Sequence, residues 1–554
     1  MVGGGPVGLS MALQLGRAGI RTLLVERRAG TSTHPRAFGI HGRTMEIFRQ
    51  WGIAKEVRAR GIPHERTRGV AWFTRLTGEE LGRVMLADEA PADPGPGPEP
   101  PCFCPQPTYE GVLLDAVRRE EHVAVEFRCE ARAISQSDDG VEVTVHHLDD
   151  DAAEQVRARY VVAADGLAST LRTLLGIGES GTPAFGHTVN VQVRADLERY
   201  ARDKPFVLMW IVNGDTQGTL APAGADFTRW TYNFAGEPGA IYPDEHVIEQ
   251  VRQAVGDPEL DVEVLKVLPW TYDQAVAEHW RAGRVFLVGD AAHRFPPHGG
   301  FGMNSGIQDA QNLAWKLREV LRGGAGDTLL DTYEAERKPV AEFNGRQSLH
   351  NTESMKKTGW RMPDPAELSR IELPNEGRDI RARIAAGVPG QRDHFRSEGQ
   401  QYGVIYTSDA VVDDGTVAEV SSVTDYRATG HPGARAPHVW LTRPYGEVLS
   451  TIDLWDGGFV LLSSGDSRWE AAARTVSADG PPISVHAIGP DADLRDTTCP
   501  WTSLYGVGEG GAVLVRPDGH VGARFSDLPK DAAAQLVSAL RHILQTTAGA
   551  TSRG

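Results

Sequence analysis

The pattern of apolar and polar positions over residues 1–26 predicts the end of a strand, a glycine-rich turn, a helix and a second strand. The helix covers residues 9–18 and the second strand covers residues 21–26. Only Met1 and Val2 precede the turn, so the leading strand is either very short or incomplete in this sequence. This order of elements is that of a βαβ unit, which favours an α/β fold.

Between about residue 180 and residue 275, apolar and polar positions alternate, and many of the apolar side chains are aromatic. The clearest examples are residues 189–193, 206–210 and 228–234. A period of two is typical of an antiparallel sheet, so we expect such a sheet to be inserted between two parts of the first unit. An apolar strand at 284–289 and a long helix at 303–322 then return to that unit.

Four other segments have simpler patterns. Residues 42–60 predict one helix, because their apolar side chains recur at helical spacing. Residues 88–107 are crowded with Pro and Gly and predict an exposed loop. Residues 356–408 are polar and irregular and predict a linker, whereas residues 409–554 have the pattern of another α/β unit.

Composition narrows the class of protein. The chain has 554 residues, which predicts more than one domain, and a net charge of −17, which argues against a nucleic-acid partner. No apolar run reaches the roughly 20 residues that a membrane span needs, and the first residues do not form a signal peptide. We therefore expect a cytoplasmic protein that binds neither nucleic acid nor membrane.

The four cysteines do not indicate disulfides or a metal site. Cys102, Cys104 and Cys129 lie in the first quarter of the chain, and Cys499 lies far from them. The single residue between Cys102 and Cys104 is not the spacing of a redox or zinc pair, so we expect no metal.

A glycine motif carries the first chemical signal. Gly3, Gly5 and Gly8 follow the G-x-G-x-x-G pattern, and Glu26 ends the next strand. The first glycine makes the turn, the second lets a pyrophosphate approach the backbone, and the third allows helix and strand to pack closely. The helix N-terminus then presents free N–H groups to the phosphates, and the acid can accept ribose hydroxyls. The motif predicts dinucleotide binding without separating FAD from NAD.

A second motif favours FAD. Residues 284–304 combine an apolar strand, Gly289-Asp290, Pro296-Pro297 and a glycine-rich loop before a helix. Asp290 can hold polyol hydroxyls, and the N–H groups of the loop suit the negative charge on the N1–C2–O2 edge of a reduced flavin. A nicotinamide needs no such anion site.

Together with Asp165-Gly166 and residues 164–172, these motifs resemble the flavoprotein aromatic hydroxylases. This family includes p-hydroxybenzoate, phenol, chlorophenol and polyketide hydroxylases.

The resemblance implies a Rossmann-like FAD-binding domain, an inserted antiparallel substrate domain and a C-terminal thioredoxin-like domain. The C-terminal unit has no Cys-x-x-Cys pair, so a packing role or homo-oligomer formation is expected rather than disulfide chemistry. The implied boundaries are 1–180 for the first part of the FAD domain, 181–275 for the substrate domain, 276–355 for the second part of the FAD domain, 356–408 for the linker and 409–554 for the C-terminal domain.

The resemblance also implies roles for individual residues. The expected cofactor-binding residues are Gly3, Gly5, Pro6, Gly8, Glu26, Arg27, Arg36, Gln106, Asp165, Gly166, Asp290, Pro297, Gly300, Gly302, Met303 and Asn304. The expected lining of the substrate pocket is Trp210, Tyr232, Phe234, Trp270 and His298. The catalytic candidates are Pro297, Tyr232, Tyr272 and His41. Phenol hydroxylases have an aspartate where this chain has Phe38, so no catalytic base can be transferred directly.

By this resemblance, NADPH or NADH reduces bound FAD, and O2 then forms a flavin C4a-hydroperoxide that hydroxylates an aromatic, phenolic or polyketide-type substrate. Two alternatives stay open. The first is a Baeyer–Villiger or epoxidising flavin monooxygenase on the same scaffold. The second is a non-catalytic FAD-binding interaction protein.

Overall fold

A parallel sheet forms the centre of the N-terminal domain in this computed structural model, which describes residues 1–34, 37–87, 96–361, 365–478, 480–497 and 499–546. Strand β1 (Thr22–Glu26) pairs with β6 (Val123–Phe127), and β10 (Val161–Ala163) pairs with β17 (Val285–Leu287). Val2 forms parallel bridges to both Val25 and Ala163, so it lies in the sheet between β1 and β10.

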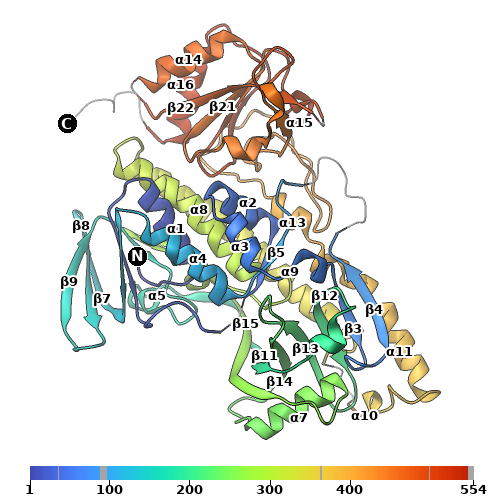
Figure 1. The fold of residues 1–554 in the computed structure, drawn as a ribbon. Helices are drawn as coiled ribbons and strands as arrows, with labels where there is room; N and C mark the ends of the chain where they lie inside the picture. The colour runs from blue at the N-terminus through green and yellow to red at the C-terminus, as the bar shows by residue number, and fades with distance from the viewer. Residues whose placement is uncertain (35–36, 88–95, 362–364, 479, 498, 547–554) are drawn as a thin grey trace.

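Three helices pack together on this sheet (Figure 1): α1 (Pro6–Arg17), α4 (Gln106–Arg118) and α8 (Phe301–Leu321). A three-stranded sheet of β7 (Cys129–Ser137), β8 (Gly140–His147) and β9 (Ala153–Ala158) shares the same hydrophobic core. The single helix predicted at 42–60 is in fact two, α2 (Gly42–Gln50) and α3 (Ala54–Arg60). They are separated at Gly52, whose φ of +67° does not continue a helix.

The inserted domain is built on an eight-stranded sheet of order β18-β15-β11-β14-β13-β12-β3-β4. Its strands are β3 (Gly69–Phe73), β4 (Glu80–Met85), β11 (Glu179–Arg194), β12 (Phe206–Val212), β13 (Gln217–Pro222), β14 (Arg229–Ala235), β15 (Glu263–Ala277) and β18 (His293–Arg294). All neighbours are antiparallel except β12 and β3. Strands β3, β4 and β18 come from outside the predicted range 181–275. Helix α7 (Asp244–Val255) covers one face of this sheet.

The prediction of an irregular linker at 356–408 is wrong. After the long helix α9 (Asp331–Met355), this segment forms the helices α10 (Pro365–Leu368), α11 (Glu376–Gly387), α12 (Arg392–Phe395) and α13 (Glu398–Tyr402). Ile380, Ile384 and Val388 pack into one core with Leu81 and Val84 of β4. The polar composition misled the prediction because only a narrow apolar stripe of α11 is buried.

The C-terminal unit contains a four-stranded sheet of order β22-β21-β24-β25. Its strands are β21 (Phe459–Ser463), β22 (Ile483–Ala487), β24 (Ala512–Val515) and β25 (Val521–Phe525), and its main helices are α14 (Ser467–Ser477) and α16 (Ala532–Ile543). The unit lies above α8 in Figure 1. Buried ion pairs join it to the rest of the chain, among them Arg516 with Glu336 at 2.6 Å.

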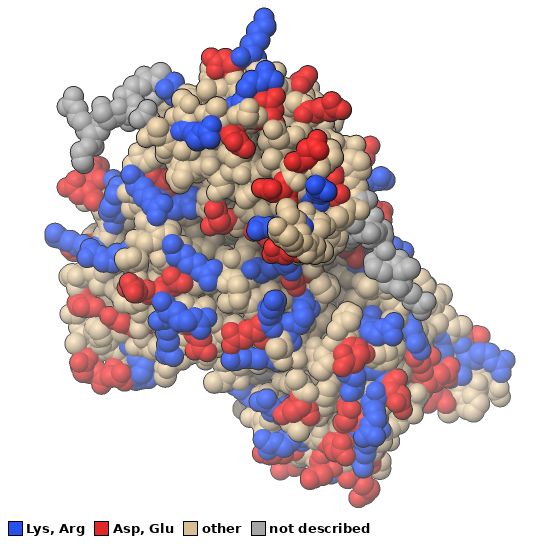
Figure 2. Space-filling model, turned by 45° about the horizontal axis from the view of Figure 1, so that its top comes forward, with Lys and Arg blue, Asp and Glu red and all other residues tan. Residues whose placement is uncertain are grey.

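The charges of the surface are mixed. On the face seen in Figure 2, basic and acidic side chains are interspersed, so the net negative charge is not gathered there into one patch. Among the described residues, no helix is both long enough and apolar enough to cross a bilayer.

Candidate active site

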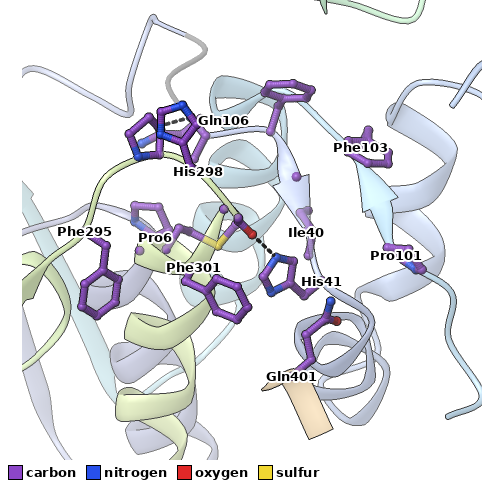
Figure 3. Close-up of a pocket in the computed structure, with 18 of the residues that line it drawn as sticks. Pro6, Ile40, His41, Pro101, Phe103, Gln106, Phe295, His298, Phe301 and Gln401 are labelled. Carbon is purple, nitrogen blue, oxygen red and sulfur yellow. Dashed lines mark hydrogen bonds between the residues drawn. The ribbon is translucent and has the colours of Figure 1, made fainter. Parts of the chain in front are cut away.

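One continuous cavity of about 2230 Å³ runs between the domains. Its walls come from the N-terminal domain, the face of the eight-stranded sheet opposite α7, described residues between 360 and 402 and the edge of the C-terminal unit. Part of it is shown in Figure 3. The cavity has two regions, which we call the nucleotide cradle and the substrate chamber.

The nucleotide cradle begins at the glycine turn. A Cβ on Gly3, where φ is +103°, would lie 2.2 Å from the Ala164 carbonyl oxygen, and one on Gly8 would lie 1.9 Å from that of Gly3. A Cβ on Gly5 would meet nothing within 4 Å. Gly3, Gly5 and Pro6 line the cavity, whereas Gly8 does not. Gly8 therefore serves close packing, which is the role that the glycine motif predicts for its third glycine.

Glu26 lines the cradle together with Arg27. Its carboxylate accepts hydrogen bonds from the backbone N–H groups of Gly4 at 2.6 Å and Arg28 at 2.9 Å. Burial raises the pKa of Glu26, but these bonds and the Arg28 guanidinium outweigh burial and lower it. The side chain is therefore an anionic acceptor, as binding to ribose hydroxyls requires.

Asp165 and Gly166 line the cradle beside the glycine turn, and Asp290 lines it as well. One carboxylate oxygen of Asp165 accepts a hydrogen bond from the N–H of Leu171 at 3.1 Å. Its other oxygen, Oδ1, is buried and has no hydrogen-bond partner among the described residues. A buried unpartnered oxygen is costly, so it indicates a missing donor such as a cofactor hydroxyl.

The turn before α8 closes the cradle. Pro297, Gly300, Gly302 and Met303 line the cavity there, and Gly300 has a φ of +71°. Asn304 does not line it. Its side chain instead accepts a hydrogen bond from the N–H of His41 at 3.0 Å and donates to the Gly300 carbonyl at 2.7 Å. Asn304 thus fixes the turn, and the expectation that it contacts the cofactor is not supported.

His41 holds the same turn from the other side. Its Nε2 donates a hydrogen bond to the Gly299 carbonyl at 2.9 Å, drawn as a dashed line in Figure 3. Burial lowers the pKa of His41 to about 4, so the ring is neutral near pH 7. His41 and Asn304 together point two carbonyls into the protein and leave the start of α8 facing the cavity.

Gln106 also lines the cradle, and its Oε1 accepts a hydrogen bond from the N–H of Ala37 at 3.3 Å. Arg36, the other flavin contact expected in this region, lies outside the described residues.

Aromatic side chains form the substrate chamber. Trp210, Trp270 and His298, three of the residues expected to line the pocket, do line it, and so does Tyr272, which was expected as a catalytic candidate. Trp210 stacks on His298 with 6.4 Å between ring centroids, and Tyr272 meets Trp270 edge to face at 4.7 Å. Burial raises the pKa of Tyr272, so its hydroxyl stays protonated.

Tyr232 and Phe234 do not line the cavity, so their predicted roles in the pocket and in catalysis are wrong. Both point to the other face of β14, into the core beneath α7. The Tyr232 hydroxyl is fully buried against Thr216 Oγ1 at 2.5 Å. Their neighbours Thr231 and Asn233 line the chamber instead. Side chains alternate between the two faces of a strand, and an aromatic side chain can lie either on the core face or on the face that lines the cavity.

These features fit FAD. The open surface over Gly5, the unpartnered oxygen of Asp165 and the N-termini of α1 and α8 lie along one cavity. Two helix N-termini suit a pyrophosphate and an anionic ring edge, respectively.

Comparison with known proteins supports the same assignment. Residues 1–348 match the family model of an FAD binding domain, and residues 429–547 match that of an aromatic-ring hydroxylase C-terminal domain. The chain belongs to the FAD-dependent aromatic hydroxylases. The resemblance inferred from the sequence is confirmed.

Curated relatives of this hydroxylase cover nearly its whole length. Tetracenomycin A2 monooxygenase-dioxygenase of Streptomyces glaucescens is 38% identical, over 99% of this chain and 97% of the relative. The 2,4-dichlorophenol 6-monooxygenase of Delftia acidovorans is 33% identical, over 98% and 97%. The structure of the flavin-dependent monooxygenase PieE in complex with FAD and substrate has a TM-score of 0.91 and 33% identity, over 99% of this chain and 98% of that one.

Sequence reasoning missed part of the hydroxylase's chamber. Trp360, Arg392 and His394 line it, and all three come from the segment that was predicted to be a linker. Phe38 also lines the cavity, where it lies 5.9 Å from Phe103, so an apolar contact occupies the position of the phenol hydroxylase aspartate. Only the apolar spacing within 380–388 could have indicated that this segment packs against the sheet.

A further buried residue, Asp309, was also missed. It accepts hydrogen bonds from the Gly289 N–H at 3.2 Å and from His293 Nε2 at 2.7 Å, and it pairs with Arg337 at 2.8 Å. This network fixes the turn that carries Asp290. Burial raises the pKa of Asp309, but the charges of His293 and Arg337 outweigh burial and lower it.

Proposed function

We propose that this protein is an NAD(P)H-consuming monooxygenase that hydroxylates a polycyclic, polyketide-type phenol. The observation that carries the proposal is the continuity of the nucleotide cradle with a large aromatic chamber in one cavity of about 2230 Å³. Ligand pockets usually measure about 300–1,000 Å³, so this cavity has room for a dinucleotide and a second sizeable ligand. The relatives named tetracenomycin A2 monooxygenase-dioxygenase and aklavinone 12-hydroxylase support a polycyclic substrate.

When bound, FAD supplies the redox chemistry, passing electrons from NAD(P)H to O2 so that one oxygen atom enters the substrate and the other becomes water. The chain supplies binding and orientation. Glu26, Asp165 and Asp290 would hold cofactor hydroxyls. The N–H groups that begin α8 lack partners within the helix and would stabilise negative charge on the cofactor ring.

The chamber would hold the aromatic substrate against the turn at Pro297. Its indole and phenol rings match a planar ligand, and they exclude water, which would otherwise compete with oxygen transfer to the substrate. The chamber residues Tyr272, His298 and His394 are neutral near pH 7, because burial raises the pKa of the first and lowers those of the two histidines. We propose that these three side chains orient the substrate by neutral contacts and do not form an ion pair with it.

The test uses purified protein reconstituted with FAD. A panel of monocyclic phenols and polycyclic hydroxyquinones is incubated with NADH or NADPH, and nicotinamide oxidation is compared with the mass of the product. We expect polycyclic compounds to stimulate oxidation and to gain one oxygen atom. Turnover of monocyclic phenols alone would refute the polycyclic assignment, and hydrogen peroxide without oxygenated product would refute the monooxygenase. A ring-expanded lactone would favour the Baeyer–Villiger alternative.

We also propose that the C-terminal unit, expected to be thioredoxin-like, has a packing role. Arg516 is fully buried between Glu336 of α9 and Asp518. Arg435 of the same unit forms a buried pair with Glu46 of α2. Since Cys499 is the unit's sole cysteine, dithiol chemistry within it is not available.

A further inference from the structure

His298 occupies the junction between the cradle and the chamber. It follows Pro297 in the turn before α8, lines the cavity and is only 3% exposed. Trp210 stacks on its ring, and the rings of Tyr272 and His394 lie 5.8 Å and 5.4 Å away between centroids. Figure 3 places it near the turn that His41 holds. A polar ring in this position would lie beside any aromatic ligand that reaches the cofactor.

Two hydrogen bonds fix which nitrogen of His298 carries the proton. The Thr352 hydroxyl donates to the Ser348 carbonyl at 2.8 Å and lies 2.9 Å from His298 Nδ1. A hydroxyl has a single proton, so at the second contact Thr352 must accept and Nδ1 must donate. Burial, together with the positive charge of Arg361, lowers the pKa of His298 to about 3, so the ring carries no second proton.

The consequence is an imidazole with a free lone pair on Nε2. Among the residues that the structure describes, none forms a hydrogen bond with this atom. A nitrogen of this kind can accept a hydrogen bond but cannot donate one. It therefore favours a ligand O–H, whereas an ether or a phenolate in the same place would present only lone pairs to it.

We propose that His298 is a specificity-determining residue that accepts a hydrogen bond from a free, protonated hydroxyl on the substrate ring nearest the cofactor, and that Thr352 is its positioning residue. The inference rests on the proposed function and deepens it, because it names the group that the chamber recognises. No bond is made or broken at His298. Its hydrogen bond draws the hydroxyl-bearing ring towards Pro297 and leaves the proton on the substrate oxygen.

The preference should be measurable without turnover. The ligands are 2-hydroxyanthraquinone and 2-methoxyanthraquinone, which differ only in the hydroxyl proton and a methyl group. Their affinities for the FAD-reconstituted protein at pH 6 are measured by quenching of tryptophan fluorescence. We expect the hydroxy compound to bind at least about tenfold more tightly, since the ether leaves a buried acceptor unsatisfied. Equal affinity, or failure of the hydroxy compound to bind, overturns the inference.

Variants separate recognition from packing. His298→Phe keeps a ring against Trp210 but removes the acceptor, so it should abolish the preference between the two ligands. Thr352→Val removes the partner of Nδ1 and should reduce the preference several-fold, whereas Thr352→Ser keeps the hydroxyl and should retain it. An equal loss of affinity for both ligands in Thr352→Val would show a packing role alone and would refute its assignment as a positioning residue.

These experiments distinguish failure of the role proposed for His298 from failure of the proposed monooxygenase function. If the protein hydroxylates members of the panel but shows no hydroxyl preference, the role of His298 is refuted and the monooxygenase stands. If the preference is present in the wild type and lost in His298→Phe while no substrate gains oxygen, recognition stands and the monooxygenase is refuted. Retention of FAD, read from its visible absorbance, must match between variants for either comparison.

Discussion

The nucleotide cradle and the substrate chamber share one cavity but are built in different ways. The cradle uses mainly backbone from short contiguous motifs, such as the open surface over Gly5 and the turn at Gly300. The chamber uses side chains from strands and helices that are distant in the sequence, among them Trp210, Tyr272 and Trp360. Backbone recognition suits a cofactor that is common to a family, whereas side chains can change from one substrate to another.

Their electrostatics also differ. The cradle carries the carboxylates of Glu26, Asp165 and Asp290 along with the helix N-termini. Much of the chamber lining is aromatic, and burial lowers the pKa of its histidines so that they stay neutral. The carboxylates of the cradle are therefore suited to accept hydrogen bonds from hydroxyls and its helix N-termini are suited to phosphates, whereas the chamber is suited to a planar, aromatic ligand.

The largest effect is expected in the cradle. Gly8→Val would force a Cβ to within 1.9 Å of the Gly3 carbonyl oxygen, which is backbone and cannot move aside. We expect loss of FAD binding by at least about 100-fold together with a lower melting temperature. Gly5→Ala is the matched variant, because its Cβ meets nothing within 4 Å. Without FAD, the Gly5→Ala variant should have the melting temperature of the wild type. Its affinity for FAD should nevertheless be lower than that of the wild type. Equal FAD affinity in Gly5→Ala would contradict a pyrophosphate contact at this glycine.

Acid should destabilise both regions through their buried histidines. The folded protein holds His41 at a pKa of about 4 and His298 at about 3, below the ordinary value of 6.5, so unfolding takes up protons. The stability from each ring is complete above pH 6.5 and is lost as the pH falls through the folded pKa, on the order of 3 kcal/mol for His41 and about 5 kcal/mol for His298. Melting temperatures between pH 7 and pH 4 test this. In His298→Gln the drop should be smaller, and an unchanged drop would mean that His298 is not held neutral.

A smaller effect is expected from substitutions on the two faces of β12, which should change different properties. Trp210→Leu removes a chamber wall and the stacking on His298, so KM for the substrate should rise about tenfold while FAD affinity stays constant. Met209→Leu lies on the opposite face, in the core under α7, and conserves volume, so it should cost under about 1.5 kcal/mol and leave KM unchanged. Steady-state kinetics and FAD titration measure both. A rise in KM for Met209→Leu would break the distinction between the faces.

The smallest effect concerns Tyr232. Tyr232→Phe removes one hydroxyl that is bonded to Thr216, on the face of β14 opposite the chamber lining. We expect a loss of about 1 kcal/mol in the free energy of unfolding and no change in kcat or KM. Chemical denaturation and kinetics on the same preparation test this. A large fall in kcat would restore the catalytic role that the sequence suggested for this residue.

The accuracy of the sequence predictions also differs between the nucleotide cradle and the substrate chamber. Much of the cradle could be predicted because its requirements are local. A positive φ at Gly3 and a close approach at Gly8 each demand glycine at a fixed place along the chain. The chamber was predicted in part. Trp210 was placed correctly and Tyr232 was not, although both lie in strands with clear alternation and both are aromatic.

The amino-acid sequence by itself determined the βαβ start, the FAD motifs, the inserted sheet and the family, since each depends on residue type at short spacing. The tertiary structure alone decided which face of that sheet is the chamber. Helix α7 covers the face of Tyr232 and Phe234, whereas Trp360 and residues 365–402 fold over the other face and complete the cavity. Alternation fixes that a strand has two faces, but only long-range packing determines which of them is buried in the core and which lines the cavity.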